Sequence, residues 1–270
     1  MTFIPPFDDL KIVEGQGTVA VEALQDLPDM DAMFIPIGGG GLAAGASYYL
    51  KNKNKAIKCY GVEPEGAPSM QAALTHGAPI ELEHINKFVD GAAVKKIGAT
   101  TFEIAKQLLD DTRSIPEGKI CTCILELYNK DAIVVEPAGA LSVAALEFHK
   151  DEIKGKKVVC IISGGNNDID RMSEIKELSL LYEGYKHYFI VRFPQRPGAL
   201  KLFVSEVLGP KDDITRFEFI KKTERERGPA LVGIELNKPE DYTTLIERMK
   251  EYKFDVIEIN KDQTLFEYLV

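Results

Sequence analysis

The stretch Phe34-Ile35-Pro36-Ile37-Gly38-Gly39-Gly40-Gly41-Leu42-Ala43-Ala44-Gly45 carries the strongest local signal of this 270-residue chain. A short apolar run predicts a buried strand over Ala32–Ile37, and four glycines then lead into a predicted helix over Leu42–Leu50. Without Cβ atoms, successive backbone N–H groups can turn toward one anion, and the helix N-terminus adds partial positive charge. The stretch therefore predicts a phosphate site that needs no lysine or arginine.

The same stretch admits a second interpretation. Gly39-x-Gly41-x-x-Ala44 fits a loose form of the dinucleotide-binding fingerprint, and Glu63 follows Gly41 by 22 residues, where an acid that binds ribose is expected. Such a fingerprint usually follows the first strand of its domain. A fragment of a nucleotide-binding dehydrogenase thus stays open as an alternative.

A second glycine-rich motif, Ile161-Ile162-Ser163-Gly164-Gly165-Asn166-Asn167, follows another apolar run. If that run is a buried parallel strand, its Ser163 hydroxyl lies at the carboxyl edge of the sheet, where ligands bind in open α/β sheets. The two motifs together predict one ligand site at this edge.

Outward from these motifs, the first part of the chain alternates strand and helix signals. Further strands are predicted over Ile57–Val62 and Val158–Ser163, and helices over Thr100–Leu109, Ala138–Phe148 and Arg171–Tyr182. This order is typical of βα units around a parallel sheet that is buried on both faces.

The second part follows a different order, βαββαβ, which is the ferredoxin-like arrangement. A boundary is expected between residues 184 and 185, because residues 185–270 hold 15 basic and 15 acidic residues, so that the whole net charge of −9 lies in residues 1–184. An edge strand is also expected over Leu265–Val270. The main elements are expected at His187–Phe193, Pro197–Leu208, Ile214–Lys222, Pro229–Leu236, Tyr242–Tyr252 and Asp255–Ile259.

Composition excludes several classes of protein. The acidic balance disfavours a nucleic-acid binder, and the short basic cluster is interpreted as a solvated hairpin tip. The cysteines lack metal-ligand spacing and are expected to be reduced core thiols in the cytoplasm. No signal peptide and no membrane span are expected, because Pro36 and the glycines interrupt the longest uncharged run. The basic cluster comprises Lys221, Lys222, Arg225 and Arg227, and the cysteines are Cys59, Cys121, Cys123 and Cys160.

These motifs resemble the fold type II pyridoxal-phosphate enzymes, whose fold is that of the tryptophan synthase β subunit, and specifically the biosynthetic threonine dehydratases. The resemblance runs from Thr2 to about Tyr182, with Pro5-Pro6 where the family often has His-Pro. It rests on FIPPFD (3–8), EGQGT (14–18), GGGGL (38–42), GVEP (61–64), VDGAAV (89–94), VEPAGA (135–140) and SGGN (163–166).

The resemblance implies pyridoxal 5'-phosphate as the cofactor. The amides of Gly38, Gly39, Gly40, Gly41 and Leu42 would hold its phosphate, Ser163 would bond its pyridine nitrogen, and Gly91, after Asp90, would lie near its face. A neutral hydroxyl at that nitrogen suits β-elimination. Glu63 and Ala67 match positions that carry a cation in some relatives, but Ser69 replaces the third ligand, so no metal site is expected.

Beyond Tyr188, the stretch FPQRPGAL (193–200) resembles the start of an ACT-like regulatory domain, with further similarity at Asp213–Phe219 and Gly233–Leu236. In the family this module senses isoleucine. The resemblance therefore implies isoleucine or valine as an effector, and a dimer or tetramer of identical chains. A purely structural role in dimerisation stays open for this module.

The family reaction, deamination of L-threonine to 2-oxobutanoate and ammonia in isoleucine biosynthesis, needs a lysine that binds the cofactor covalently and moves the α-proton. The family carries that lysine in a Ser-x-Lys-x-Arg-Gly stretch, which does not occur in these 270 residues, and we assign no catalytic residue. The chain is thus interpreted as the latter part of a threonine dehydratase, a lyase, that is inactive alone. A non-catalytic regulatory or partner subunit is the alternative.

Overall fold

The computed structural model describes residues 4–219 and 227–270. The chain divides into two compact units, Met1–Lys176 (unit 1) and Glu177–Val270 (unit 2). Within the described residues, no helix is both long enough and apolar enough to cross a membrane.

Unit 1 is an α/β layer structure around a parallel sheet of four strands in the order β3-β2-β1-β4. Three short helical turns, Ala145–His149, Lys150–Ile153 (α7) and Ile169–Arg171, complete it. Its strands are β1 (Ala32–Pro36), β2 (Lys58–Pro64), β3 (Asp111–Ile115) and β4 (Val158–Cys160). Its main helices are α1 (Leu10–Asp26), α2 (Gly41–Lys53), α3 (Ser69–His76), α4 (Ala99–Leu108), α5 (Glu117–Asp131), α6 (Pro137–Ala144) and α8 (Met172–Tyr182), the last of which crosses into unit 2.

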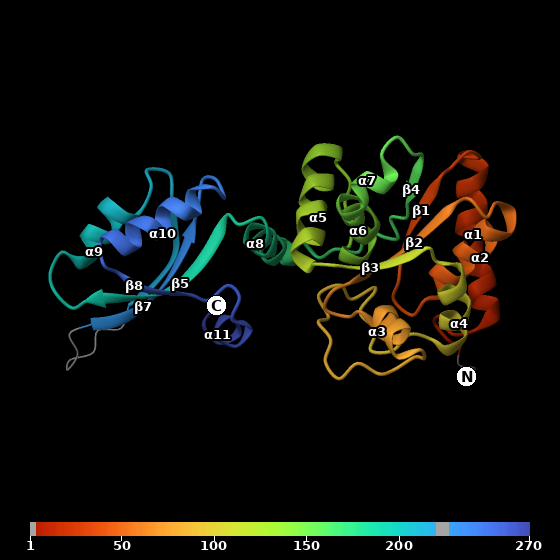
Figure 1. The fold of residues 1–270 in the computed structure, drawn as a ribbon, viewed down its shortest axis with the longest axis horizontal. Helices are drawn as coiled ribbons and strands as arrows, with labels where there is room; N and C mark the ends of the chain where they lie inside the picture. Colours follow the sequence, from red (N-terminus) through yellow and green to blue (C-terminus); the bar gives the residue numbers. More distant parts are fainter. Residues whose placement is uncertain (1–3, 220–226) are drawn as a thin grey trace. The chain divides into compact units, whose positions relative to one another are not determined.

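Strand β1 lies between β2 and β4, with Ala32 opposite Lys58 on one side and opposite Val158 on the other. Because the strands are parallel, the segments that follow β1 and β4 leave the sheet at the same edge. The register thus brings the two glycine-rich motifs of the sequence to neighbouring positions, as expected (Figure 1).

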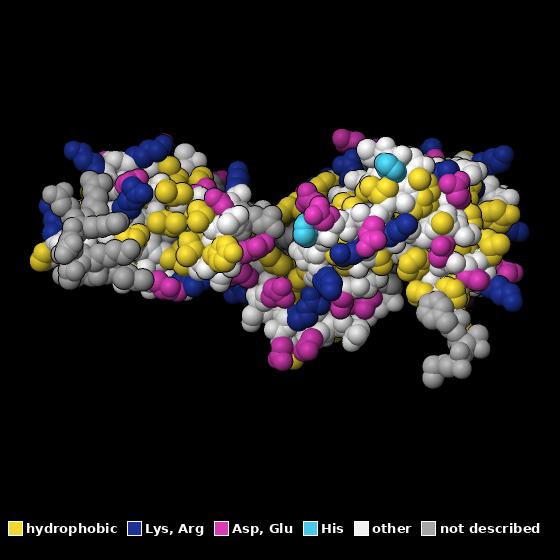
Figure 2. Space-filling model, turned by 90° about the horizontal axis from the view of Figure 1, so that it is seen from below, with side chains coloured by type: hydrophobic (Ala, Val, Ile, Leu, Met, Phe, Trp, Pro, Cys, Tyr) yellow, Lys and Arg dark blue, Asp and Glu magenta, His cyan; other side chains and the backbone are white. Residues whose placement is uncertain are grey.

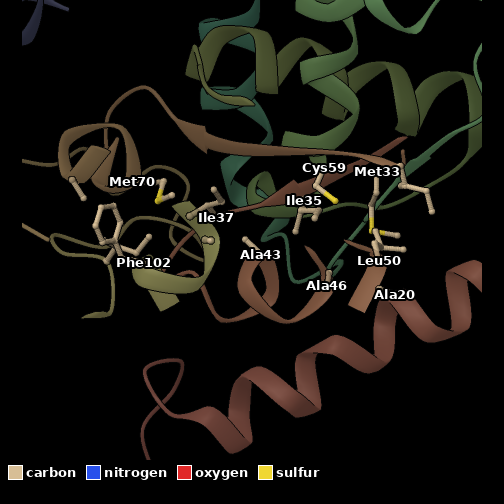
Figure 3. Close-up of a cluster of buried hydrophobic side chains, with 14 of the residues drawn as sticks. Ala20, Met33, Ile35, Ile37, Ala43, Ala46, Leu50, Cys59, Met70 and Phe102 are labelled. Atoms are coloured by element: carbon tan, nitrogen blue, oxygen red, sulfur yellow. The ribbon is translucent and has the colours of Figure 1, made fainter. Parts of the chain in front are cut away.

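Both faces of β1 are buried, which explains its unbroken apolar run. Met33, Ile35 and Ile37 point toward α2, where Ala43 and Ala46 present small side chains that let the helix lie close to the sheet (Figure 3). On the other face, the Phe34 ring stacks on Tyr60 with centroids 4.8 Å apart and meets the His149 ring edge-on. This packing fixes the N-terminus of α2 directly beyond β1.

Helices α1 and α2 cross where each has a glycine, Gly17 on α1 and Gly45 on α2. A Cβ on Gly45 would lie 2.1 Å from the carbonyl oxygen of Val13 and 2.7 Å from the amide nitrogen of Gly17. Beside this crossing runs an apolar groove of about 610 Å³ lined by residues that include Leu10, Tyr48 and Tyr49. Figure 2 shows hydrophobic side chains interspersed with acidic and basic ones on one face of unit 1.

Unit 2 has the ferredoxin-like order, with an antiparallel sheet of four strands arranged β6-β7-β5-β8. Phe193, Phe203 and Phe254 pack edge to face in its core between the sheet and the helices. The elements are β5 (Lys186–Pro194), α9 (Ala199–Leu202) with a π-helical turn over Phe203–Val207, β6 (Asp213–Phe219), β7 (Arg227–Glu235), α10 (Asp241–Glu251), β8 (Asp255–Glu258) and α11 (Gln263–Leu269).

Two local expectations differ from the structure. The edge strand expected over Leu265–Val270 is wrong, because Asp262 caps a helix there by accepting a hydrogen bond from the Leu265 amide at 3.0 Å. Strand β4 ends at Cys160, so Ser163 lies in the loop beyond it. Lys221, Lys222 and Arg225 of the expected basic hairpin tip lie outside the described residues, as does the side chain of Arg227.

Candidate cofactor site

The loop between β1 and α2 offers a row of amides without partners. Within residues 4–219 and 227–270, no backbone hydrogen bond uses an amide of Gly38, Gly39, Gly40, Gly41 or Leu42 as its donor. Gly40 and Gly41 are nevertheless buried, and buried amides are normally paired. Gly40 adopts φ +89°, which glycine tolerates, and caps α2 without a side-chain contact. An anion at this helix N-terminus would satisfy the amides, so the loop fits the phosphate of a cofactor.

Gly91 lies close to Gly38 of the glycine loop and to Ala138 of α6. The backbone of Gly38 packs against it, since a Cβ on Gly38 would meet the Gly91 oxygen at 3.4 Å and the Ala92 Cα at 3.1 Å. On its other side, a Cβ on Gly91 would approach the Ala138 Cβ to 2.9 Å. Arg171 holds this loop by donating a hydrogen bond to the Phe88 carbonyl at 2.7 Å.

Ser163 is exposed at the edge of the sheet, and its hydroxyl donates a hydrogen bond to Glu136 Oε1 at 3.2 Å. The Glu136 amide in turn donates to the Gly164 carbonyl at 3.0 Å, which ties the start of α6 to the serine loop. Glu136 accepts this hydrogen bond, so the single hydroxyl proton of Ser163 points to Glu136. Glu136 belongs to the VEPAGA motif, but the sequence alone gave no reason to assign it a role.

The segment before α1 also belongs to the site. The Phe7 ring covers Gly39, because a Cβ on Gly39 would lie 2.0 Å from a ring carbon. Its neighbour Asp8 accepts hydrogen bonds from the Ala99 and Thr100 amides at the start of α4, at 3.0 and 2.8 Å. Sequence reasoning missed these contacts, although both residues lie in the FIPPFD stretch.

Glu63 does not serve the alternative of a dinucleotide site. Its carboxyl group is fully buried at the end of β2 and accepts hydrogen bonds from the Met70 and Gln71 amides of α3, at 2.8 and 2.9 Å. Burial raises its pKa to about 7, against the effect of these two bonds. A carboxyl group that caps a helix in this way does not face a ribose. Among the described residues, no group of three His, Cys, Asp or Glu side chains could hold a metal ion.

Unit 2 contains a separate cavity of about 440 Å³, a size typical of small-molecule sites. Its walls are the segment Phe193–Lys201, which runs from the end of β5 into α9, and the rings of Phe217 and Phe219 on β6. Aromatic rings supply an apolar wall, while Arg196 and Lys201 bring positive charge to the rim.

A parallel sheet with a glycine loop at its carboxyl edge is typical of α/β proteins that bind a phosphorylated cofactor. Residues 1–164 match the family model described as pyridoxal-phosphate dependent enzyme, and the chain belongs to this family. Residues 177–269 match the model of the C-terminal regulatory domain of threonine dehydratase. These matches confirm the expected fold class and cofactor.

Among curated proteins, the chain is 58% identical over 271 residues to the biosynthetic L-threonine dehydratase of Halalkalibacterium halodurans, and 57% identical over 270 residues to that of Bacillus subtilis. Both alignments cover 100% of this chain. The chain spans 65% and 64% of the length of these relatives.

Solved structures show the same similarity. Processed threonine deaminase isoform 2 of Solanum lycopersicum aligns with TM-score 0.63 and 37% identity over 66% of this chain and 53% of that one. Serine racemase of Dictyostelium discoideum aligns with TM-score 0.57 and 34% identity, over 62% of this chain and 54% of that one.

Proposed function

We propose that this chain provides the phosphate site, the pyridine contact and the regulatory module of a pyridoxal-phosphate dependent threonine dehydratase, which converts L-threonine to 2-oxobutanoate and ammonia. The observation that carries the proposal is the row of amides at the N-terminus of α2 that have no partner among the described residues, with Gly38 packed against Gly91. The two curated relatives with this activity in their names support the choice of substrate.

Each group has a separate role in this proposal. The amides of Gly38–Leu42 bind the cofactor phosphate, the Ser163 hydroxyl contacts the pyridine nitrogen, and Gly91 leaves room at the ring face. The Ser163 hydroxyl has one proton, which must turn from Glu136 to donate to the pyridine nitrogen. When bound, the cofactor withdraws electrons from the α-carbon of the amino acid, which permits loss of the β-hydroxyl group.

Phosphate binding is tested with pyridoxamine 5'-phosphate, which cannot react with surface lysines, and with pyridoxamine as the ligand that lacks the phosphate. Leu42→Asp places a negative charge in the first turn of α2, where it repels the ligand phosphate, at the cost of the packing of Leu42 on the apolar core. Leu42→Asn is the matched neutral variant.

Equilibrium dialysis should show tighter binding of the phosphorylated ligand by the wild-type chain. Leu42→Asp should bind it about tenfold more weakly than Leu42→Asn, because tenfold corresponds to a repulsion of about 1.4 kcal/mol between the two negative charges. Equal affinities of the wild-type chain for the two ligands would overturn the proposed phosphate site.

We also propose that a polypeptide of these 270 residues does not deaminate threonine by itself, because the Ser-x-Lys-x-Arg-Gly stretch does not occur in it. The purified chain, supplied with pyridoxal 5'-phosphate and threonine, should form no 2-oxo acid above the rate of free cofactor. Sustained formation of 2-oxobutanoate by the chain would contradict this.

The cavity of unit 2 supports a regulatory function in addition, with isoleucine or valine as the effector. The apolar rings of Phe193 and Phe217 suit a branched side chain, and Arg196 suits a carboxylate. Calorimetric titration with isoleucine, valine and threonine tests this role. Saturable binding of a branched amino acid that Arg196→Gln weakens would support the regulatory role. If none of the three amino acids binds, unit 2 has a structural role instead.

We further propose that the protein acts in the cytoplasm as a dimer or tetramer of identical chains. The apolar groove beside α1 and α2 supports association, since exposed apolar surface of this kind usually marks a contact with another polypeptide. Sedimentation equilibrium of the purified chain measures the assembly directly.

A further inference from the structure

The carbonyl group of Gly39, in the middle of the glycine loop, is held by a residue 62 positions away in the sequence. The Thr101 hydroxyl donates a hydrogen bond to the Gly39 oxygen at 2.7 Å, and its other acceptor, the Gly98 oxygen, is more distant at 3.2 Å. The Gly98 amide reaches the same Gly39 oxygen at 3.3 Å. Thr101 has no exposed surface, so this bond is shielded from water.

This bond determines where the next amide points. A trans peptide unit directs its C=O and N–H groups to opposite sides, and the described residues contain no cis peptide bond. With the Gly39 carbonyl bonded toward α4, the Gly40 N–H must point away from α4. The Gly40 Cα also lies directly over Thr101, because a Cβ there would come within 2.8 Å of the hydroxyl oxygen.

The helix that carries Thr101 is fixed from the same region. Asp8 caps the first turn of α4 through the amides of Ala99 and Thr100, and the adjacent Phe7 ring covers Gly39. Asp8 therefore fixes the start of α4, and Thr101 of α4 in turn fixes the glycine loop. The three segments form one connected arrangement around the unpaired amides.

We propose that Thr101 is a positioning residue of the phosphate site: it fixes the plane of the peptide between Gly39 and Gly40, so that the Gly40 amide is already aimed at the cofactor phosphate before binding. The inference rests on the proposed phosphate site. Thr101 touches no cofactor atom and acts through the loop alone. Without its hydrogen bond, only the longer bond from the Gly98 amide holds the Gly39 oxygen, and cofactor binding must order the peptide plane further.

The experiment compares four variants of the whole chain, with pyridoxamine 5'-phosphate and pyridoxamine as ligands in equilibrium dialysis. Thr101→Val keeps the shape of the side chain and removes the donor, and Thr101→Ala removes the donor without adding volume. Thr101→Ser retains the hydroxyl. Thr75→Val is the control for the same substitution, because the exposed Thr75 hydroxyl also bonds a backbone carbonyl, that of Gln71 in α3.

We expect Thr101→Val and Thr101→Ala to bind the phosphorylated ligand about fivefold more weakly, the equivalent of one ordinary hydrogen bond. Thr101→Ser and Thr75→Val should stay within about twofold of wild type, and binding of pyridoxamine should not change in any variant. If Thr101→Val and Thr101→Ala lost affinity for both ligands to the same extent, Thr101 would have a merely structural role, and the inference would be overturned.

The two proposals fail in different ways. If the wild-type chain prefers the phosphorylated ligand and both variants without the hydroxyl bind it as well as wild type does, Thr101 has no positioning role, while the phosphate site stands. If the wild-type chain itself shows no preference for the phosphorylated ligand, the phosphate site is wrong, and the role of Thr101 with it.

Discussion

The crossing of α1 and α2 leads to a quantitative prediction for Gly45→Ala. The added Cβ would lie 2.1 Å from the Val13 oxygen and 2.7 Å from the Gly17 nitrogen, both of them backbone atoms that cannot rotate away. Relief of the shorter contact requires the two helices to separate by about 1 Å, and strain of this kind costs about 3 kcal/mol at the upper end of the usual range.

Alanine is also the better helix former, by about 1 kcal/mol, so the net destabilisation should be about 2 kcal/mol. Gly15→Ala is the matched control. Gly15 is exposed on α1, and a Cβ on it would have no atom within 4 Å, so the same change should stabilise the chain by about 0.5–1 kcal/mol.

Thermal unfolding followed by circular dichroism measures this difference. The midpoint temperature of unit 1 should fall by about 4–8 °C for Gly45→Ala, given the usual 2–4 °C per kcal/mol in a domain of this size. Equal stabilities of Gly45→Ala and Gly15→Ala would refute the reasoning, because they would show that the helices accommodate a methyl group without strain.

Two further predictions concern carboxyl groups whose pKa is shifted by their surroundings. Burial raises the pKa of Glu63 from 4.5 to about 7, so the folded state favours its protonated form. The wild-type chain should therefore lose on the order of 3 kcal/mol of stability as the pH rises from 5 to 8, and Glu63→Gln should not. Urea unfolding of both proteins at both pH values measures this difference. In unit 2, the hydrogen bond from His187, at 2.7 Å, lowers the pKa of Glu258, whose other oxygen accepts from the Tyr242 hydroxyl. Glu258→Gln should therefore destabilise β5 and β8 by about 1 kcal/mol at pH 7, which amide hydrogen exchange can measure. The difference in stability should vanish as the pH falls below the usual carboxyl range. A difference that persists in urea unfolding at pH 3 would contradict this.

The residue types in the sequence were sufficient to predict strand β1 and the glycine turn that follows it. The apolar run over Ala32–Ile37 has residues of both faces buried, so no alternation with polar residues interrupts the strand signal. The glycines beyond it mark the turn because few other residues adopt the φ of Gly40.

Other features depend on contacts that no local pattern reveals. Helix α1 contains Gly15 and Gly17, which lower its helix propensity, and it is stabilised instead by packing on α2 and by Asp9 as its N-cap. The aromatic and β-branched residues near Leu265–Val270 suggest a strand, but the Asp262 cap and packing on the sheet favour a helix. The bonds from Ser163 to Glu136 and from Thr101 to Gly39 join segments 27 and 62 residues apart.

The position of β4 beside β1 has a consequence for biosynthesis. The Lys157 amide donates a hydrogen bond to the Asp31 carboxylate, 126 residues earlier in the sequence. Strand β1 can therefore pair with β4 only after the ribosome has synthesised the residues between them. At roughly 5–20 residues per second, the wait lasts about 6–25 s. During that interval one edge of β1 is open, and the apolar strand is exposed to pairing with other nascent chains. Aggregation during synthesis should thus depend on the rate of translation between Pro36 and Val158.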